Sequence, residues 1–113
     1  MASGRGPRTV AFEIDEDVLA RLDEAAARLG ATRNGVIRDA LRRFLARAAS
    51  PGDVRLAPKP SSPRRRLVSF KGDRELMAAL REAAARLGVS VSDVVRSAIA
   101  DFLSSQAGQP GQR

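Results

Sequence analysis

The stretch Glu24–Gly30 reads EAAARLG, and Glu82–Gly88, 58 residues further along the chain, reads EAAARLG again. The same shift places Arg8–Leu45 on Arg66–Leu103 with 18 identities in 38 aligned positions. The four phenylalanines, the only aromatic residues, fall into two equivalent pairs, at positions 12 and 70 and at positions 44 and 102. Alanine-rich helices alone would not align such rare residues, so the chain is a tandem duplication.

Each copy opens with a short alternating segment, which predicts a strand with one buried face. The inward apolar residues are Val10, Phe12, Ile14, Val68 and Phe70. The outward residues are Thr9, Ala11, Glu13, Leu67, Ser69 and Lys71. At the position of Ile14 the second copy has Gly72, which predicts that the second strand ends early or contains a bulge.

Two amphipathic helices follow the strand in each copy. Asp15 and Asp73 stand at the N-cap of the first helix, and a glycine follows its last turn in both copies. The apolar face expected for that helix in the first copy comprises Val18, Leu19, Leu22, Ala25, Ala26 and Leu29. Thr32 and Ser90 are the expected caps of the second helix. Each copy is therefore predicted to be strand, helix, helix.

A copy of about 40 residues buries too little surface to fold alone, and its single strand would leave backbone groups unpaired. We therefore expect the two strands to pair antiparallel in one intertwined domain that is mainly α-helical. The expected division is a disordered tail at 1–7, the first copy at 8–48, a proline-rich basic linker at 49–65, the second copy at 66–105 and a disordered tail at 106–113.

The start of the second helix carries a further signature: Gly30–Leu41 reads GATRNGVIRDAL and Gly88–Ile99 reads GVSVSDVVRSAI. With the preceding strand and capped helix, this pattern resembles the ribbon-helix-helix family, to which Arc and the methionine repressor belong. Proteins of that type read DNA with a β-ribbon. The resemblance covers roughly 80 of the 113 residues and implies two tandem ribbon-helix-helix copies that form a single-chain pseudo-dimer.

The chain has 20 basic and 13 acidic residues, and most of the net charge of +7 lies in the tails and the linker. In a ribbon-helix-helix arrangement, basic groups beside the strands and amides at the N-termini of the second helices would contact DNA phosphates. The residues predicted to bind phosphate are Arg5, Arg8, Thr32, Arg33, Asn34, Arg64, Arg65, Arg66, Ser90 and Ser92. The six outward strand residues are predicted to read bases, with Lys71 suited to guanine and Glu13 to cytosine.

These features indicate a sequence-selective, double-stranded-DNA-binding transcription regulator, most simply a repressor, whose intramolecular ribbon enters the major groove. Two alternatives stay open: a weakly selective architectural protein of the nucleoid, favoured by the small residues Ala11 and Ser69, and, with less support, an antitoxin-type protein-binding module. The roughly eight residues after the last predicted helix have no apolar anchors, which argues against toxin capture. A second copy on DNA and a small anionic effector are further partners that the sequence leaves open.

The composition narrows the function classes. The chain has no Cys, His, Trp or Tyr, which excludes disulfides, Cys/His zinc sites, thiol nucleophiles and imidazole bases. No constellation of acid, base and nucleophile stands out, so we expect no enzymatic activity, catalytic residue, metal or cofactor. No apolar run approaches the roughly 18 residues of a membrane span, and no signal peptide is evident, so a cytoplasmic, nucleoid-associated protein without a membrane partner is expected.

Overall fold

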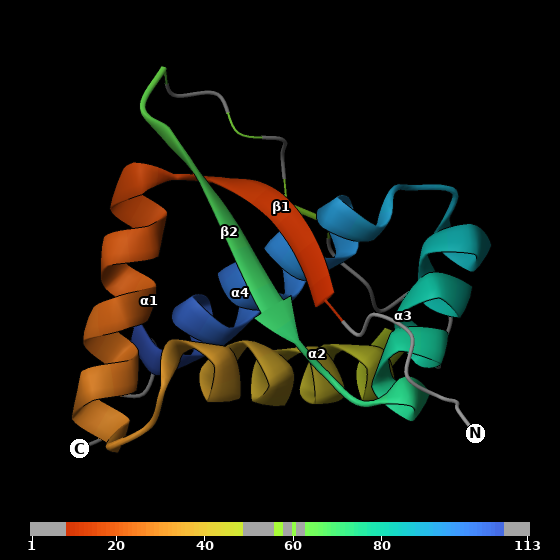
Figure 1. Ribbon diagram of the computed structural model, residues 1–113, viewed down its shortest axis with the longest axis horizontal. Coiled ribbons are helices and arrows are strands. Elements are labelled where there is room, and N and C mark those ends of the chain that lie inside the picture. The colour runs from red at the N-terminus through yellow and green to blue at the C-terminus, as the bar shows by residue number, and fades with distance from the viewer. Residues whose placement is uncertain (1–8, 49–55, 58–59, 61–62, 108–113) are drawn as a thin grey trace.

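The computed structural model describes residues 9–48, 56–57, 60 and 63–107. Its elements, in chain order, are β1 (Thr9–Asp15), α1 (Glu16–Leu29), α2 (Arg33–Ala48), β2 (Arg65–Lys71), α3 (Arg74–Leu87) and α4 (Val91–Ala107). The two strands cross in front of α2 and α4, while α1 and α3 flank them (Figure 1). This arrangement confirms a mainly α-helical fold in which the order strand, helix, helix occurs twice. Residues 1–8, which include the predicted phosphate-binding residues Arg5 and Arg8, and residues 108–113 lie outside the described residues. Gln106 and Ala107, expected in the disordered tail, belong to α4.

The two strands form one antiparallel ribbon, to which each copy contributes one strand. Ala11 lies opposite Ser69, and the 58-residue shift makes these two residues equivalent. This pair therefore marks the centre of a pseudo-two-fold relation between the copies. Each copy completes the sheet of the other, as expected for an intertwined single domain.

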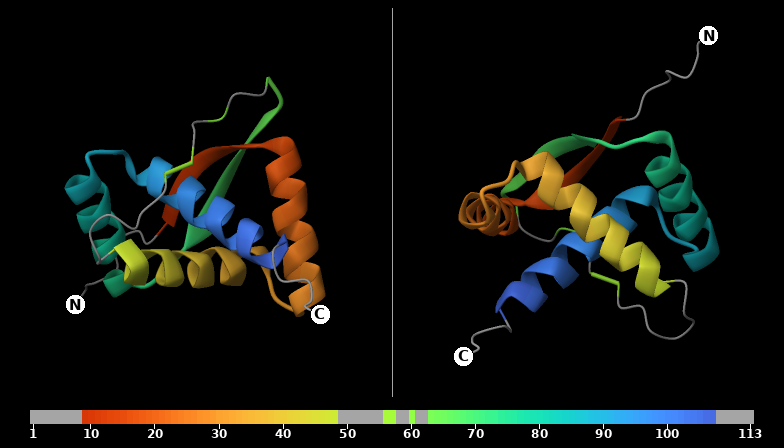
Figure 2. Two further views of the ribbon diagram at one scale, coloured as in Figure 1. Left: turned by 180° about the vertical axis from the view of Figure 1, so that it is seen from behind. Right: turned by 90° about the horizontal axis from the view of Figure 1, so that it is seen from below.

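The inner face of the ribbon packs on α2 and α4, which cross each other behind it (Figure 2). Phe12 and Phe70, one from each copy, meet edge to face with ring centroids 6.3 Å apart and an interplanar angle of 72°. Both rings are almost fully buried, so one core joins the two copies. Leu29, expected on the buried face of α1, is instead 53% exposed, because it ends the helix and the chain turns away at Gly30.

The strand β2 ends at Lys71, directly before Gly72, and its pairing with β1 contains no bulge. The predicted early end is confirmed. A Cβ atom at Gly72 would lie 2.9 Å from Cδ2 of Leu76 and 3.1 Å from Cε of Met77. These two α3 side chains, each longer than its counterpart in the first copy, fill the space that Ile14 fills there.

The first helices of the two copies, α1 and α3, begin differently although both N-caps are aspartates. The Asp73 carboxylate accepts a hydrogen bond of 2.8 Å from the Leu76 amide, whereas Asp15 makes no side-chain cap bond. At the start of α1 the Glu16 amide donates to the carbonyl of Arg64, at 2.9 Å. The approach to β2 therefore satisfies an amide at the start of α1. Both predicted C′ glycines have a left-handed backbone, with φ of 65° and 72°.

Ala57, one of the described linker residues, is hydrogen-bonded to the second copy. The Ala57 amide donates to the Ser97 hydroxyl at 2.9 Å, and that hydroxyl donates to the Asp93 carbonyl at 2.7 Å. Ser97 is buried in α4 and uses its hydroxyl both as donor and as acceptor. The described linker residue Ala57 therefore lies against α4.

Candidate nucleic-acid interface

The outer face of the ribbon carries the residues predicted to read bases. Side chains alternate across a strand, so burial of Phe12, Val68 and Phe70 directs the intervening residues outward. All six of these are exposed: Thr9, Ala11, Glu13, Leu67, Ser69 and Lys71. A two-stranded ribbon has the width that the major groove of B-DNA admits. The structure thus brings together, on one exposed surface, residues that lie about 58 positions apart in the chain.

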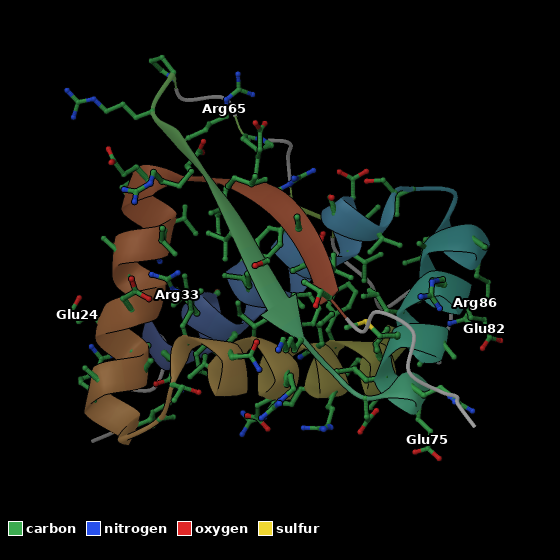
Figure 3. All side chains as sticks on the ribbon, in the orientation of Figure 1. Glu24, Arg33, Arg65, Glu75, Glu82 and Arg86 are labelled. Carbon is green, nitrogen blue, oxygen red and sulfur yellow. The ribbon has the colours of Figure 1, made fainter. Side chains whose placement is uncertain are left out.

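Arg65 adds a seventh residue to this surface, which we call the reading face. β2 begins at Arg65, two residues before the predicted strand. Because side chains alternate along a strand, Arg65 (labelled in Figure 3) lies on the same side of β2 as Leu67. Its Nη1 atom lies 3.7 Å from Oε1 of Glu13. The sequence pattern predicts a linker position for Arg65, because a proline and a run of arginines precede the alternating segment. Arginine is a side chain that commonly binds the O6 and N7 atoms of guanine.

Because side chains alternate along β2, Arg66 lies on the opposite side of the strand from Arg65. Arg66 lies opposite Ile14 and extends toward the start of α1, where its Nη1 atom lies 3.4 Å from Oε2 of Glu16. Of the three consecutive arginines, Arg65 therefore joins the reading face and Arg66 joins the edge of the ribbon.

The N-terminus of α2 has the features of an anion-binding site. The Thr32 hydroxyl accepts a 3.0 Å hydrogen bond from the Gly35 amide, so the predicted cap is confirmed. The amides of Arg33 and Asn34 lie in the first turn, where no intrahelical carbonyl reaches them, and that turn has no acidic residue. Such amides and the helix dipole attract phosphate.

Arg33 is held beside this turn by a two-pronged ion pair. Its Nε and Nη2 atoms donate to the two carboxylate oxygens of Asp23 in α1, at 2.7 and 2.8 Å. These hydrogen bonds lower the pKa of Asp23 and raise the pKa of Arg33. The pair joins α1 to α2 and fixes a guanidinium at the start of α2 (Figure 3).

The N-terminus of α4 differs in charge from that of α2. The Ser90 hydroxyl accepts from the Asp93 amide at 3.1 Å, and the Asp93 carboxylate accepts from the Ser90 amide at 3.2 Å. This reciprocal capping box is complete, and it places a carboxylate in the first turn. Asp93 also accepts a 2.6 Å hydrogen bond from Arg96. The first turn of α4 therefore contains a carboxylate, paired with Arg96, where α2 has no acidic residue. Ser92 lies in the same turn of α4.

One side chain of each second helix is hydrogen-bonded to the strand of the other copy. The amide group of Asn34 accepts from the Lys71 amide at 2.7 Å and donates to the Lys71 carbonyl at 3.1 Å. Arg96 donates to the carbonyl of Glu13 at 3.0 Å. The Asn34 side chain is thus engaged with the backbone of β2, and its backbone amide lies in the first turn of α2. These bonds set the position of each helix N-terminus relative to the reading face.

Comparison with known families agrees with this geometry. A family model of ribbon-helix-helix proteins of the copG family matches residues 8–48 and 66–104. The chain belongs to the ribbon-helix-helix family. Its members are typically DNA-binding transcription regulators or antitoxins and generally form dimers, and this ribbon-helix-helix protein carries two copies of the unit in one chain. Comparisons with curated proteins and with solved structures give no match.

Among residues 9–48, 56–57, 60 and 63–107, no group of three or more acidic side chains is arranged to hold a metal ion. None of the four described helices is long and apolar enough to cross a membrane.

The Asp23–Arg33 pair predicts a pH-dependent contribution to stability. The folded-state pKa of Asp23 is lowered, so the pair stabilises the fold above the unfolded pKa of about 3.9 and loses this effect as the pH falls through the folded value. Both side chains are 44% exposed, so we expect Asp23→Asn to cost less than about 1 kcal/mol at pH 7. Urea unfolding at pH 7 and at progressively lower pH measures the difference between wild type and variant. A difference that stays constant down to about pH 2 would contradict this role.

Proposed function

We propose that this ribbon-helix-helix protein is a sequence-selective transcription regulator, most simply a repressor, that inserts its intramolecular ribbon into the major groove of double-stranded DNA. The observation that carries the proposal is the reading face: seven exposed side chains on a ribbon whose other face is packed on helices. Contacts to the phosphates beside the groove would come from the N-terminus of α2, which Asn34 holds against the ribbon.

Base recognition would come from the polar members of the reading face. The Lys71 ammonium would donate to guanine O6 or N7, and the Glu13 carboxylate would accept from cytosine N4, each pairing discriminating by about 1–3 kcal/mol. Arg65 beside Glu13 offsets the repulsion between that carboxylate and the DNA phosphates. The phosphate contacts would come from the first turns of α2 and α4 and from basic residues beside the strands, namely Arg5, Arg8, Arg64 and Arg66.

The two ends of the reading face are chemically different. Under the pseudo-two-fold relation Thr9 is equivalent to Leu67, and Glu13 is equivalent to Lys71. One end of the ribbon therefore pairs Thr9 with Lys71, and the other pairs Glu13 with Leu67. The preferred site should consist of two unlike half-sites. Selection from random DNA should return a motif that is not palindromic, and a strictly symmetrical motif bound by a single chain would contradict this.

Titration of a fluorescent duplex at several salt concentrations, with and without competitor DNA, tests the proposal. A regulator keeps tight binding to its selected site in excess nonspecific DNA. The small central residues Ala11 and Ser69 favour the second candidate, a weakly selective architectural protein. In that case the competitor would remove the chain from every duplex equally.

Replacing Arg64, Arg65 and Arg66 together by alanine is expected to weaken binding to all sequences through the loss of phosphate contacts at Arg64 and Arg66. The loss of Arg65 from the reading face is expected to change the sequence preference as well. The slope of log affinity against log salt should flatten by about 0.9 for each phosphate contact that is lost. A matched control replaces Arg28, Arg81 and Arg86, three exposed arginines of α1 and α3, and removes the same charge. If both triple variants lower the slope equally, net charge rather than the ribbon edge governs binding.

A further inference from the structure

We infer that Leu67 recognises the C5-methyl group of a pyrimidine in the major groove, and does so in one half-site only. The inference rests on the proposed function and assigns to the reading face a specificity-determining residue that cannot form a hydrogen bond through its side chain. The group recognised is the methyl that thymine carries, or the same methyl on 5-methylcytosine.

Leu67 is the most exposed large hydrophobic residue of the described chain. Its exposed fraction is 72%, against 53% for Leu29 and 41% for Leu56, neither of which lies on the ribbon. Leu67 lies opposite Glu13 in the strand pairing, and its neighbours on the same side of β2 are Arg65 and Ser69. An apolar side chain surrounded by polar ones does not form the continuous apolar patch that a protein partner would require.

The chemistry of the groove matches such a side chain at one type of atom. The edges of the base pairs present hydrogen-bond donors and acceptors throughout the major groove, together with the C5-methyl group of thymine. A leucine placed against a donor or acceptor would remove water from it and return no hydrogen bond, which is unfavourable. A leucine placed against the methyl group buries apolar surface on both sides. Leu67 therefore favours a methylated pyrimidine and disfavours other base edges.

The equivalent position in the other strand explains why this preference belongs to one half-site. Thr9 takes the place of Leu67 there, and its side chain combines a methyl group with a hydroxyl that donates and accepts hydrogen bonds. Thr9 can thus satisfy several base edges, whereas Leu67 can satisfy only a methyl group. Because Ala11 and Ser69 lie between them at the centre of the ribbon, the two positions face opposite half-sites.

The test starts from the duplex selected from random DNA and replaces each thymine in turn by deoxyuridine, which removes only the methyl group. At one thymine of one half-site we expect binding to weaken about fourfold, the value for one methyl group buried at about 0.8 kcal/mol. At that position, a 5-methylcytosine duplex should bind tighter than a cytosine duplex by a similar factor, so the two sources of the methyl are compared directly.

Leu67→Ala should abolish the effect of deoxyuridine, and Thr9→Ala, the matched control at the equivalent position, should leave it unchanged. Binding that is insensitive to deoxyuridine at every thymine would overturn the inference, as would a methyl effect that persists in Leu67→Ala. Equal binding of the cytosine and 5-methylcytosine duplexes would also overturn it. Failure of the wild-type chain to bind any selected duplex would instead overturn the proposed function, so the two failures are distinguishable.

Discussion

Phe70→Ala is expected to lower the free energy of unfolding by about 3–5 kcal/mol. The ring is 1% exposed and meets Phe12 of the other copy edge to face, so its removal leaves a cavity where the two copies join. Small domains have a total stability of about 5–15 kcal/mol, and the variant would lose a large part of it. Urea unfolding followed by circular dichroism measures the change.

Leu67→Ala provides the control for Phe70→Ala, since it shortens an exposed side chain of the same strand. We expect it to change stability by less than about 0.5 kcal/mol. If Phe70→Ala cost no more than this control, the core that joins the copies would not be packed as described.

Ser69→Glu is expected to weaken DNA binding at least about a hundredfold while the protein stays folded. Ser69 lies at the centre of the reading face, opposite Ala11, and a carboxylate there would enter the groove between the phosphate backbones. Juxtaposed like charges cost several kcal/mol, and about 2.8 kcal/mol corresponds to a hundredfold change in affinity. Titration of the selected duplex at fixed salt measures the loss.

Ala78→Glu is the matched control for this experiment. It adds the same charge at an exposed position of α3, away from the ribbon, and should lower affinity only slightly. Equal losses in the two variants would show that net charge, and not the ribbon, governs binding.

The sequence predicted the ribbon and six of the seven residues of its reading face, because both follow from the repeat. Alternation in Thr9–Ile14 identified the outward residues of β1, and the 58-residue shift carried the same assignment to β2. The caps of the second helices could also be predicted from local sequence. Thr32 and Ser90 each stand three residues before the amide that they cap.

The features that the sequence did not reveal depend on contacts between distant residues. Asn34 and Lys71 are 37 positions apart, and Arg96 and Glu13 are 83 apart, so no spacing rule connects them. The assignment of Arg65 to the linker failed for another reason: pairing with Asp15 extends β2 beyond the alternating apolar segment. The start of β2 is therefore determined by its pairing with β1, which the sequence pattern of β2 does not contain.

Fusion of the two copies explains the differences between them. In a dimer of identical chains, both half-ribbons and both helix N-termini carry the same residues. Here one chain supplies both, so Thr9 can differ from Leu67, and Arg33 can differ from Val91 at the start of the second helix. The copies keep the core that joins them and diverge at the surfaces proposed to contact DNA.

Titration of the ¹⁵N-labelled protein with its selected duplex, followed by amide NMR spectra, tests the central claim most directly. We expect the largest shift changes in Thr9–Glu13, in Arg65–Lys71 and in the first turn of α2, with small changes on the outer sides of α1 and α3. Changes confined to α1 and α3, with the ribbon amides unaffected, would contradict the account.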